Sequence, residues 1–372
     1  MRDGAVKIVA VGDLSFNGYY DRLLNRHGSD YPFRHVLPSW RDADLRLGNL
    51  ESPPTSQPRA TACKFTLRGS PRSIESLAQA GFNCVCVANN HMMDFGGYGL
   101  LEACARVTKA GIPVVGAGEN LEQACQPVIL NVRGQKVGIL AFCDVVQESA
   151  LYATDHSCGV ARGELAACLH HIRNLRPNVD WLIVHMHWGT ELAQLPSPLQ
   201  RQWAREMVAA GANVIIGHHP HVLQPVETIN NAVVAYSLGD FIFSESFWRG
   251  KNPRGLPFSS KVRLNSLTRT TGWLELTLLK SGAAEYCFYP ALLSRQLQVI
   301  SDDSPHRASD STKLARQLEV DNYALVFDAE LQRAARRRAR DDQYRTPTRW
   351  LELKMFQWGM LPWAVAEQEA VP

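Results

Sequence analysis

The sequence predicts an α/β sandwich with a core of mixed β-sheets, helices outside and a helical C-terminal appendage. Up to residue 238, short apolar runs alternate with amphipathic segments, which is the β-α-β rhythm of parallel sheets. Three of the amphipathic segments stop at a glycine, namely Gly81, Gly111 and Gly211, as helices commonly do. Beyond residue 238 two strand-like runs follow one another without a helix between them, which is typical of antiparallel pairing.

Each element follows from this alternation, in chain order. Buried strands are expected at residues 6–11, 43–47, 82–88, 112–115, 137–142, 181–184, 213–216 and 233–238. Helices are expected at residues 71–80, 98–110, 163–175 and 198–210. The antiparallel strands occupy residues 273–279 and 284–289, and the pattern is helical from residue 310 onward. We therefore expect one large domain at residues 1–300 and a helical extension at 301–372.

Composition restricts the class of protein. The chain has 372 residues, of which 45% are hydrophobic and 20% charged, and a formal net charge of +3. This charge is too small to indicate a nucleic-acid partner, and the arginine-rich run at 333–340 is interpreted as a solvated helix face. No apolar run is long enough to span a membrane, and the N-terminus lacks a signal-peptide pattern. We expect a cytoplasmic protein.

Polar side chains follow the predicted strands at five places. Six of the twelve histidines lie in three of these turns: His91, His185 and His187, and His218, His219 and His221. Asp13 and Glu51 follow two further strands in the same way. Because the carboxyl ends of parallel strands meet at one edge of a sheet, these turns are expected to form one polar site.

The residue types in these turns suit a metal ion. Carboxylates, an amide oxygen and neutral imidazoles form a mixed nitrogen and oxygen ligand set, which favours Mn, Fe or Zn over Ca or Mg. One or two such ions are expected, and a pair about 4 Å apart would hold a substrate oxyanion and activate water.

A basic segment lies close to these motifs in sequence. Residues 246–274 contain six basic side chains and no acidic one, amid glycine and proline. Two interpretations remain open: a lid or clamp for a carboxylate or phosphate, and a merely solvated loop. The predicted substrate-binding residues are Arg249, Lys251 and Arg254 from this loop, with Trp188 from the turn after the second histidine motif.

The ordered motif series resembles that of the CapA family, named for capsule and poly-γ-glutamate synthesis proteins. The resemblance covers residues 5–245 and is carried by the motifs Gly12-Asp13, Gly48-Asn49-Leu50-Glu51, Asn89-Asn90-His91 with Asp94, His187-Trp188-Gly189-Thr190-Glu191, Gly217-His218-His219-Pro220-His221 and Tyr236-Ser237-Leu238-Gly239-Asp240-Phe241. That family is similar in fold to the calcineurin-like metallophosphoesterases. The resemblance therefore implies a metallophosphoesterase-like αββα sandwich.

The resemblance also implies roles for individual residues. The implied metal ligands are Asp13, Glu51, Asn90, His187, His219 and His221, and the implied catalytic groups are Asp13, Glu51 and His91. Two positions depart from the pattern. The wider superfamily has Asp-x-His where this chain has Asp13-Leu14-Ser15, and the closing Gly-Asn-Phe of the CapA family reads Gly239-Asp240-Phe241.

Three functions follow as expectations. The first is a metal-dependent hydrolase or transferase acting on a phosphoester or on a peptide or γ-glutamyl bond. The second is a metal-independent peptide epimerase, in which Asp13 or Glu51 removes a Cα proton and His91 returns one from the other face. The third is a non-catalytic polymer-binding protein. In each case the expected partner is a peptide or an anionic small molecule or polymer.

Overall fold

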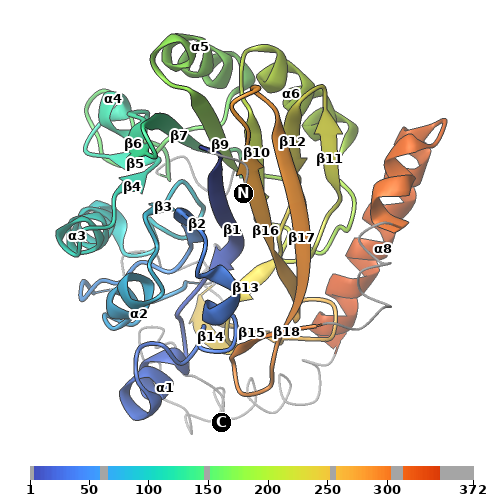
Figure 1. Ribbon diagram of the computed structural model, residues 1–372. Helices are drawn as coiled ribbons and strands as arrows, with labels where there is room; N and C mark the ends of the chain where they lie inside the picture. Colours follow the sequence, from blue (N-terminus) through green and yellow to red (C-terminus); the bar gives the residue numbers. More distant parts are fainter. Residues whose placement is uncertain (1–3, 59–65, 146–150, 252–256, 303–312, 344–372) are drawn as a thin grey trace, which may run out of the picture.

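The computed structural model describes residues 4–58, 66–145, 151–251, 257–302 and 313–343 (Figure 1). For residues 246–251, 257–262 and 339–343 the backbone alone is described. The described chain contains two large β-sheets, and both of them mix parallel and antiparallel pairs. The predicted fold class is therefore confirmed.

The first sheet is centred on strand β1 (Val6–Leu14). Its strand order is β18-β17-β16-β1-β2-β3-β4, and β13 also pairs with β1. The other members are β2 (Leu45–Leu50), β3 (Cys84–Cys86), β4 (Val114–Val115), β13 (Asp240–Ile242), β16 (Thr270–Leu278), β17 (Ala284–Leu293) and β18 (Val299–Ser301). Strand β1 runs parallel to β2 and β13 and antiparallel to β16.

The second sheet has the order β11-β12-β10-β9-β7-β6. Its strands are β6 (Val128–Val132), β7 (Gln135–Cys143), β9 (Trp181–His187), β10 (Val214–His218), β11 (Val226–Ile229) and β12 (Ala232–Ala235). The four central strands are parallel, so their carboxyl ends lie at one edge. Two short pairs complete the strands: β5 (Ala117–Gly118) with β8 (Gly159–Val160), and β14 (Ser246–Lys251) with β15 (Pro257–Val262).

The alternation of side chains along β9 shows how the layers pack. Ile183 lies in the same hydrophobic cluster as Val9 and Val11 of β1, so this face of the second sheet packs against the first sheet. Leu182 and Val184 point to the other face, where they join a second cluster with helix residues such as Ile172. Helices thus cover the outside of a double sheet, as predicted.

The helices are α1 (Tyr20–His27), α2 (Ser73–Gln79), α3 (Gly96–Lys109), α4 (Leu121–Ala124), α5 (Leu165–Leu175), α6 (Pro198–Ala209) and α8 (Tyr323–Gln343). Local sequence explains the bounds of α6. Its N-cap Ser197 accepts a hydrogen bond from the Gln200 amide in a capping box, Pro198 occupies the first turn, and Gly211 follows the end with φ 119°. Within the described ranges, no helix is both long and apolar enough to cross a membrane.

One predicted element is wrong. Residues 246–274 were expected to form a long basic loop, but β14 and β15 pair as an antiparallel hairpin and β16 begins at Thr270. The hairpin could not be recognised from the sequence, because its segments are rich in basic residues, glycine and proline. Backbone pairing does not require alternating apolar side chains. Arg269 also has a structural position, since it donates to the carbonyl oxygens of Leu293 (3.2 Å) and Ser294 (2.7 Å).

Gly217 provides a test of the close packing at the end of β10. A Cβ atom at this position would lie 1.8 Å from the Tyr236 carbonyl oxygen and 2.6 Å from the Trp188 Nε1 atom. We expect Gly217→Ala to lower the free energy of unfolding by about 3 kcal/mol, measured by urea unfolding. The control Gly134→Ala adds a Cβ in open space at φ 77° and should cost only about 1 kcal/mol. Equal effects of the two changes would contradict this interpretation.

Candidate active site

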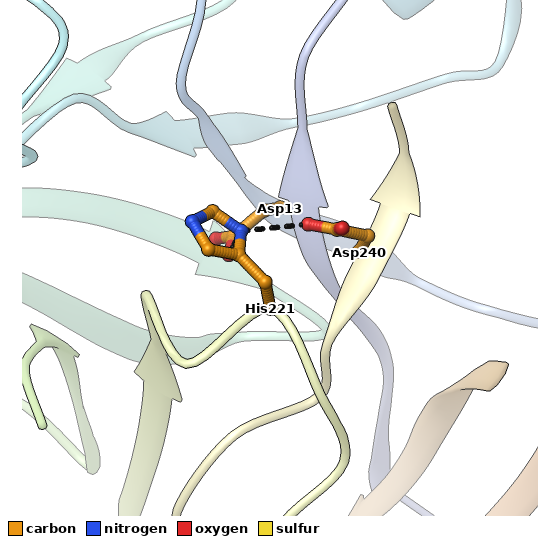
Figure 2. Close-up of side chains that lie close together, drawn as sticks. All are labelled: Asp13, His221 and Asp240. Atoms are coloured by element: carbon orange, nitrogen blue, oxygen red, sulfur yellow. Dashed lines mark hydrogen bonds and ion pairs between the residues drawn. The ribbon is translucent and has the colours of Figure 1, made fainter. Parts of the chain in front are cut away.

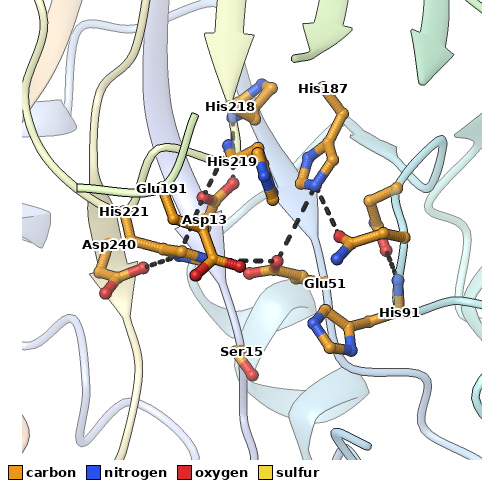
Figure 3. A network of polar contacts seen from close by, with 12 residues as sticks. Asp13, Ser15, Glu51, His91, His187, Glu191, His218, His219, His221 and Asp240 are labelled. Atoms are coloured by element: carbon orange, nitrogen blue, oxygen red, sulfur yellow. Dashed lines mark hydrogen bonds and ion pairs between the residues drawn. The ribbon is translucent and has the colours of Figure 1, made fainter. Parts of the chain in front are cut away.

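The predicted polar turns meet where strands of both sheets end (Figure 3). Asp13 lies near the end of β1, Glu51 directly follows β2, and His187 is the last residue of β9. The turn after β10 carries His219 and His221. The structure thus brings together groups that are up to 208 residues apart in sequence, from Asp13 to His221.

Asp13 is fully buried and connects the two sheets. Its Oδ1 atom accepts a hydrogen bond from Asn49 Nδ2 (2.8 Å), and its Oδ2 atom accepts one from the His219 backbone N–H (3.2 Å). Burial raises the pKa of Asp13, but the adjacent His218 and the nearby imidazoles outweigh burial and hold the pKa well below its ordinary value. Asp13 is therefore an ionised carboxylate at neutral pH.

Glu51 is fully buried, and neither of its carboxylate oxygens has a hydrogen-bond partner among the residues that the structure describes. Two imidazole nitrogens, His187 Nε2 and His221 Nε2, each lie 4.0 Å from Glu51 Oε1. Burial, and then the charge of Asp13, raise its pKa well above the ordinary value. An unpartnered buried carboxylate at this distance from two imidazoles fits a bound ion, because ligands about 2 Å from one ion lie about 3 to 4 Å apart.

Two buried imidazoles face this carboxylate. His187 Nε2 lies 2.8 Å from Asn90 Oδ1, and the His187 and His219 ring centroids are 4.9 Å apart. Burial lowers the pKa of His187, and it lowers the pKa of His219 to about 4. Both rings are therefore neutral near pH 7, which is the protonation state that binds metals. Within the described part of the chain, the Nδ1 atom of each ring is buried without a hydrogen-bond partner.

Asp13, His221 and Asp240 form a further set of possible metal ligands beside these imidazoles. Their ligand atoms lie within 4.8 Å of one another (Figure 2). His221 Nδ1 lies 2.8 Å from Asp240 Oδ1 and 3.7 Å from Asp13 Oδ2. Burial lowers the pKa of His221, but Asp240 and Glu51 outweigh burial and raise it well above the ordinary value. Burial raises the pKa of Asp240 to about 6.

The turn that carries these histidines has an unusual backbone. His219 and His221 have φ values of 96° and 58°, which residues with a side chain rarely adopt. Such positions cost about 1 to 3 kcal/mol each and occur mainly at functional sites. Here they place both rings on the side of Glu51.

His91 lies at the edge of this cluster and is 8% exposed. Its Nδ1 atom is 2.9 Å from Asp94 Oδ2, and Asp94 Oδ2 also accepts the Leu67 backbone N–H at 2.7 Å. The carboxylate therefore orients the imidazole, with the proton on Nδ1 as the tautomer that satisfies this contact. This arrangement suits a group that transfers protons at Nε2.

Several predicted residues have other positions. Trp188 is fully buried, and its Nε1 atom donates to the Tyr236 carbonyl oxygen (3.1 Å); its substrate-binding role stays a prediction. Arg249 and Lys251 lie in β14, where the backbone alone is described, and Arg254 lies outside the described residues. The Ser15 hydroxyl donates to Asn17 Oδ1 (3.0 Å), away from the cluster.

Two functional candidates were missed or left open by the sequence. Glu191 stands beside Asp13 and the histidine turn in Figure 3, although sequence gave it no role. Asp240 stays ambiguous in sequence because it starts a strand that pairs with β1, where it lies opposite Asp13 in the register. The departure from the Gly-Asn-Phe pattern is the one sequence signal at Asp240.

Comparison with known proteins places this geometry in a family. The family model "Bacterial capsule synthesis protein PGA_cap" matches residues 7–245. The chain belongs to this family. It is 34% identical over 250 residues to the capsule biosynthesis protein CapA of Bacillus anthracis, a match that covers 65% of this chain and 61% of that protein. It is 32% identical over 278 residues to the PGA biosynthesis protein CapA of Bacillus subtilis (strain 168), covering 74% and 71%.

Two solved structures of nucleotidases match the chain at low similarity. The NAD nucleotidase of Haemophilus influenzae has a TM-score of 0.41 and 14% identity, with 91% of this chain and 60% of that chain covered. A putative 5′-nucleotidase from Staphylococcus aureus has a TM-score of 0.42 and 14% identity, with 85% and 58% covered.

The low pKa of His219 predicts a pH dependence of stability. Its pKa is about 4 in the folded protein, below the value of about 6.5 for an unfolded chain. The native state therefore binds fewer protons, and the free energy of unfolding decreases as the pH falls from about 6.5 to about 4. We expect His219→Asn to lose about 1 to 3 kcal/mol less unfolding free energy than the wild type over this pH range, because the titrating imidazole is gone. Urea unfolding in chelator-containing buffer measures this. The control His156→Asn changes an exposed histidine and should leave the pH dependence of the unfolding free energy as in the wild type.

Proposed function

We propose that this chain is an enzyme that uses one or two divalent transition-metal ions to hydrolyse or transfer a bond in an anionic substrate. The observation that carries this proposal is Glu51, which is buried with an imidazole nitrogen 4.0 Å away from each of two histidines and has no hydrogen-bond partner among the described residues. The ligand set favours Mn, Fe or Zn. The substrate is a phosphoester or a peptide or γ-glutamyl compound, the latter supported by the PGA biosynthesis protein among the relatives.

Two neighbouring groups would hold the ions. Glu51, Asn90, His187 and His219 form one group, and Glu51 with Asp13, His221 and Asp240 forms the other. When bound, such an ion lowers the pKa of a water molecule and polarises the bond under attack.

The side chains supply the remaining chemistry. His91 keeps one proton on Nδ1, toward Asp94, and as the doubly protonated imidazolium it would give the proton on Nε2 to the leaving group. Asn49 holds the Asp13 carboxylate with its side-chain amide, at 2.8 Å, so that the oxygens keep a fixed direction. Burial of the cluster excludes bulk water and strengthens each electrostatic contact.

A second candidate function is metal-independent epimerisation at a peptide Cα. The observation that favours it is Ser15, which replaces an imidazole ligand and is bonded to Asn17. Glu51 has a raised pKa and is suited to take a proton, and His91 would return one from the other face. Neutral imidazoles such as His187 would donate to the developing oxyanion.

Elemental analysis of the purified full chain tests the first candidate. We expect about one or two equivalents of Mn, Fe or Zn, and chelator-sensitive hydrolysis of bis(p-nitrophenyl) phosphate. Glu51→Gln should lose both the metal and the activity because it removes the shared carboxylate, whereas the exposed Glu122→Gln should keep them. A folded chain without metal, together with deuterium uptake at peptide Cα positions in heavy water, would establish the epimerase instead. Polymer binding that survives Asp13→Asn and His91→Ala without turnover would indicate a non-catalytic role.

The Asp240 carboxylate gives a sharper test of the ligand set. Asp240→Asn removes a charge within 2.8 Å of His221 while it keeps the size and the acceptor atom. We expect the dissociation constant for Mn²⁺ to rise by about tenfold, measured by calorimetric titration. An unchanged constant would show that Asp240 serves only to orient His221 within the fold.

A further inference from the structure

The loop between β9 and α6, residues 188–196, brings Glu191 to the histidine cluster (Figure 3). Its backbone is attached to the histidine turn, since the Leu192 N–H donates to the Pro220 carbonyl oxygen at 2.8 Å. Burial raises the pKa of Glu191, but the adjacent His219 and His221 and the Arg338 guanidinium outweigh burial and lower it. Glu191 therefore adds a negative charge beside the proposed metal ligands.

The other side of this loop contacts helix α8, at the edge of the molecule in Figure 1. Glu330 is only 3% exposed, and its Oε1 atom accepts the Gln194 backbone N–H at 2.9 Å. Arg337 Nη1 donates to the Leu192 carbonyl oxygen at 2.8 Å and to Glu330 Oε1 at 2.6 Å. Arg338 forms an ion pair with Glu191 itself, at 3.1 Å.

One face of α8 is directed toward the 188–196 loop. Tyr323, Phe327, Glu330, Ala334 and Arg337 follow one another at spacings of three and four residues, which places them on one side of the helix. Phe327 and Ala334 are buried, and the Tyr323 hydroxyl donates to the Pro196 carbonyl oxygen at 2.6 Å. The prediction that residues 333–340 form only a solvated face is therefore wrong at Arg337.

We propose that α8 is part of the catalytic centre: its ion pair between the buried Glu330 and the partly buried Arg337 positions the 188–196 loop and thereby holds Glu191 at the metal site. This inference rests on the proposed function of that site. The family match ends at residue 245, so α8 lies beyond it. The contacts that position the 188–196 loop therefore come from the C-terminal extension. Glu330 and Arg337 are positioning residues, and Glu191 supplies the charge that favours a bound cation.

The test compares α8 variants of the full chain by two measurements. Hydrogen–deuterium exchange reports the order of residues 188–196 directly, and calorimetric titration gives the dissociation constant for Mn²⁺. We expect Arg337→Ala and Glu330→Gln to speed exchange in this loop by about tenfold. The same variants should raise the dissociation constant by about three- to tenfold, as Glu191→Gln does.

Two further variants keep the test decisive. Arg336→Ala removes an exposed arginine from the same helix and should change neither measurement. Arg338→Ala removes the ion pair from a side chain that is 64% exposed, so the fold is kept. It should leave loop exchange unchanged and lower the dissociation constant for Mn²⁺, because a positive charge that competes for the Glu191 carboxylate is lost.

The two proposals fail in different ways. If the loop exchanges at the same rate in wild type, Arg337→Ala and Glu330→Gln, α8 does not position the loop, whatever the metal content. If the loop loosens but the dissociation constant stays the same, Glu191 has no role at the site and the inference is overturned. If neither the wild type nor any variant binds Mn²⁺ while loop exchange responds as expected, the metal proposal fails. The positioning of the loop by α8 is then kept.

Discussion

The hydrogen bonds of Asp13 hold the two sheets in register at the place where the site forms. One carboxylate oxygen accepts from Asn49 on β2 of the first sheet, and the other accepts from the His219 backbone on the turn after β10 of the second. In a buried, low-dielectric environment such charge-assisted bonds are strong and leave little freedom to either partner. The positions of Glu51 on one side and of His219 and His221 on the other follow from this link.

The cluster concentrates charge in a way that folding alone does not favour. Asp13, Glu51 and Asp240 are all buried, and the charge of Asp13 raises the pKa of both other carboxylates. His221 offsets part of this repulsion through its contacts with all three. Sites of this kind, with shifted pKa values and positive φ angles, are typical of function and are stabilised by the surrounding fold.

The two departures from the family pattern concern neighbouring parts of the site. Ser15 removes an imidazole two residues after Asp13, and Asp240 adds a carboxylate opposite Asp13 in the register of β1 and β13. The loss of a neutral ligand and the gain of a charge therefore occur around the same aspartate. This exchange is the reason that both metal chemistry and acid–base chemistry are proposed for this site.

The sequence by itself determined the sandwich and most of the site residues. Parallel strands place their following turns at one edge, so Asp13, Glu51, His187 and His219 could be assigned to one site from local pattern alone. The same pattern predicted β1 and β10 close to their observed bounds, because buried strands are continuous apolar runs.

Only the tertiary structure decided the features that depend on which segments meet. The β14–β15 hairpin depends on backbone pairing between basic segments, and the burial of Trp188 depends on β12 ending behind it. Glu191 and Asp240 join the site through a loop and a register that no local periodicity encodes. The contacts of Arg337 could be recognised only once Glu330 and the 188–196 loop were seen beside it, because its acceptor in that loop, the Leu192 carbonyl oxygen, lies far away in sequence.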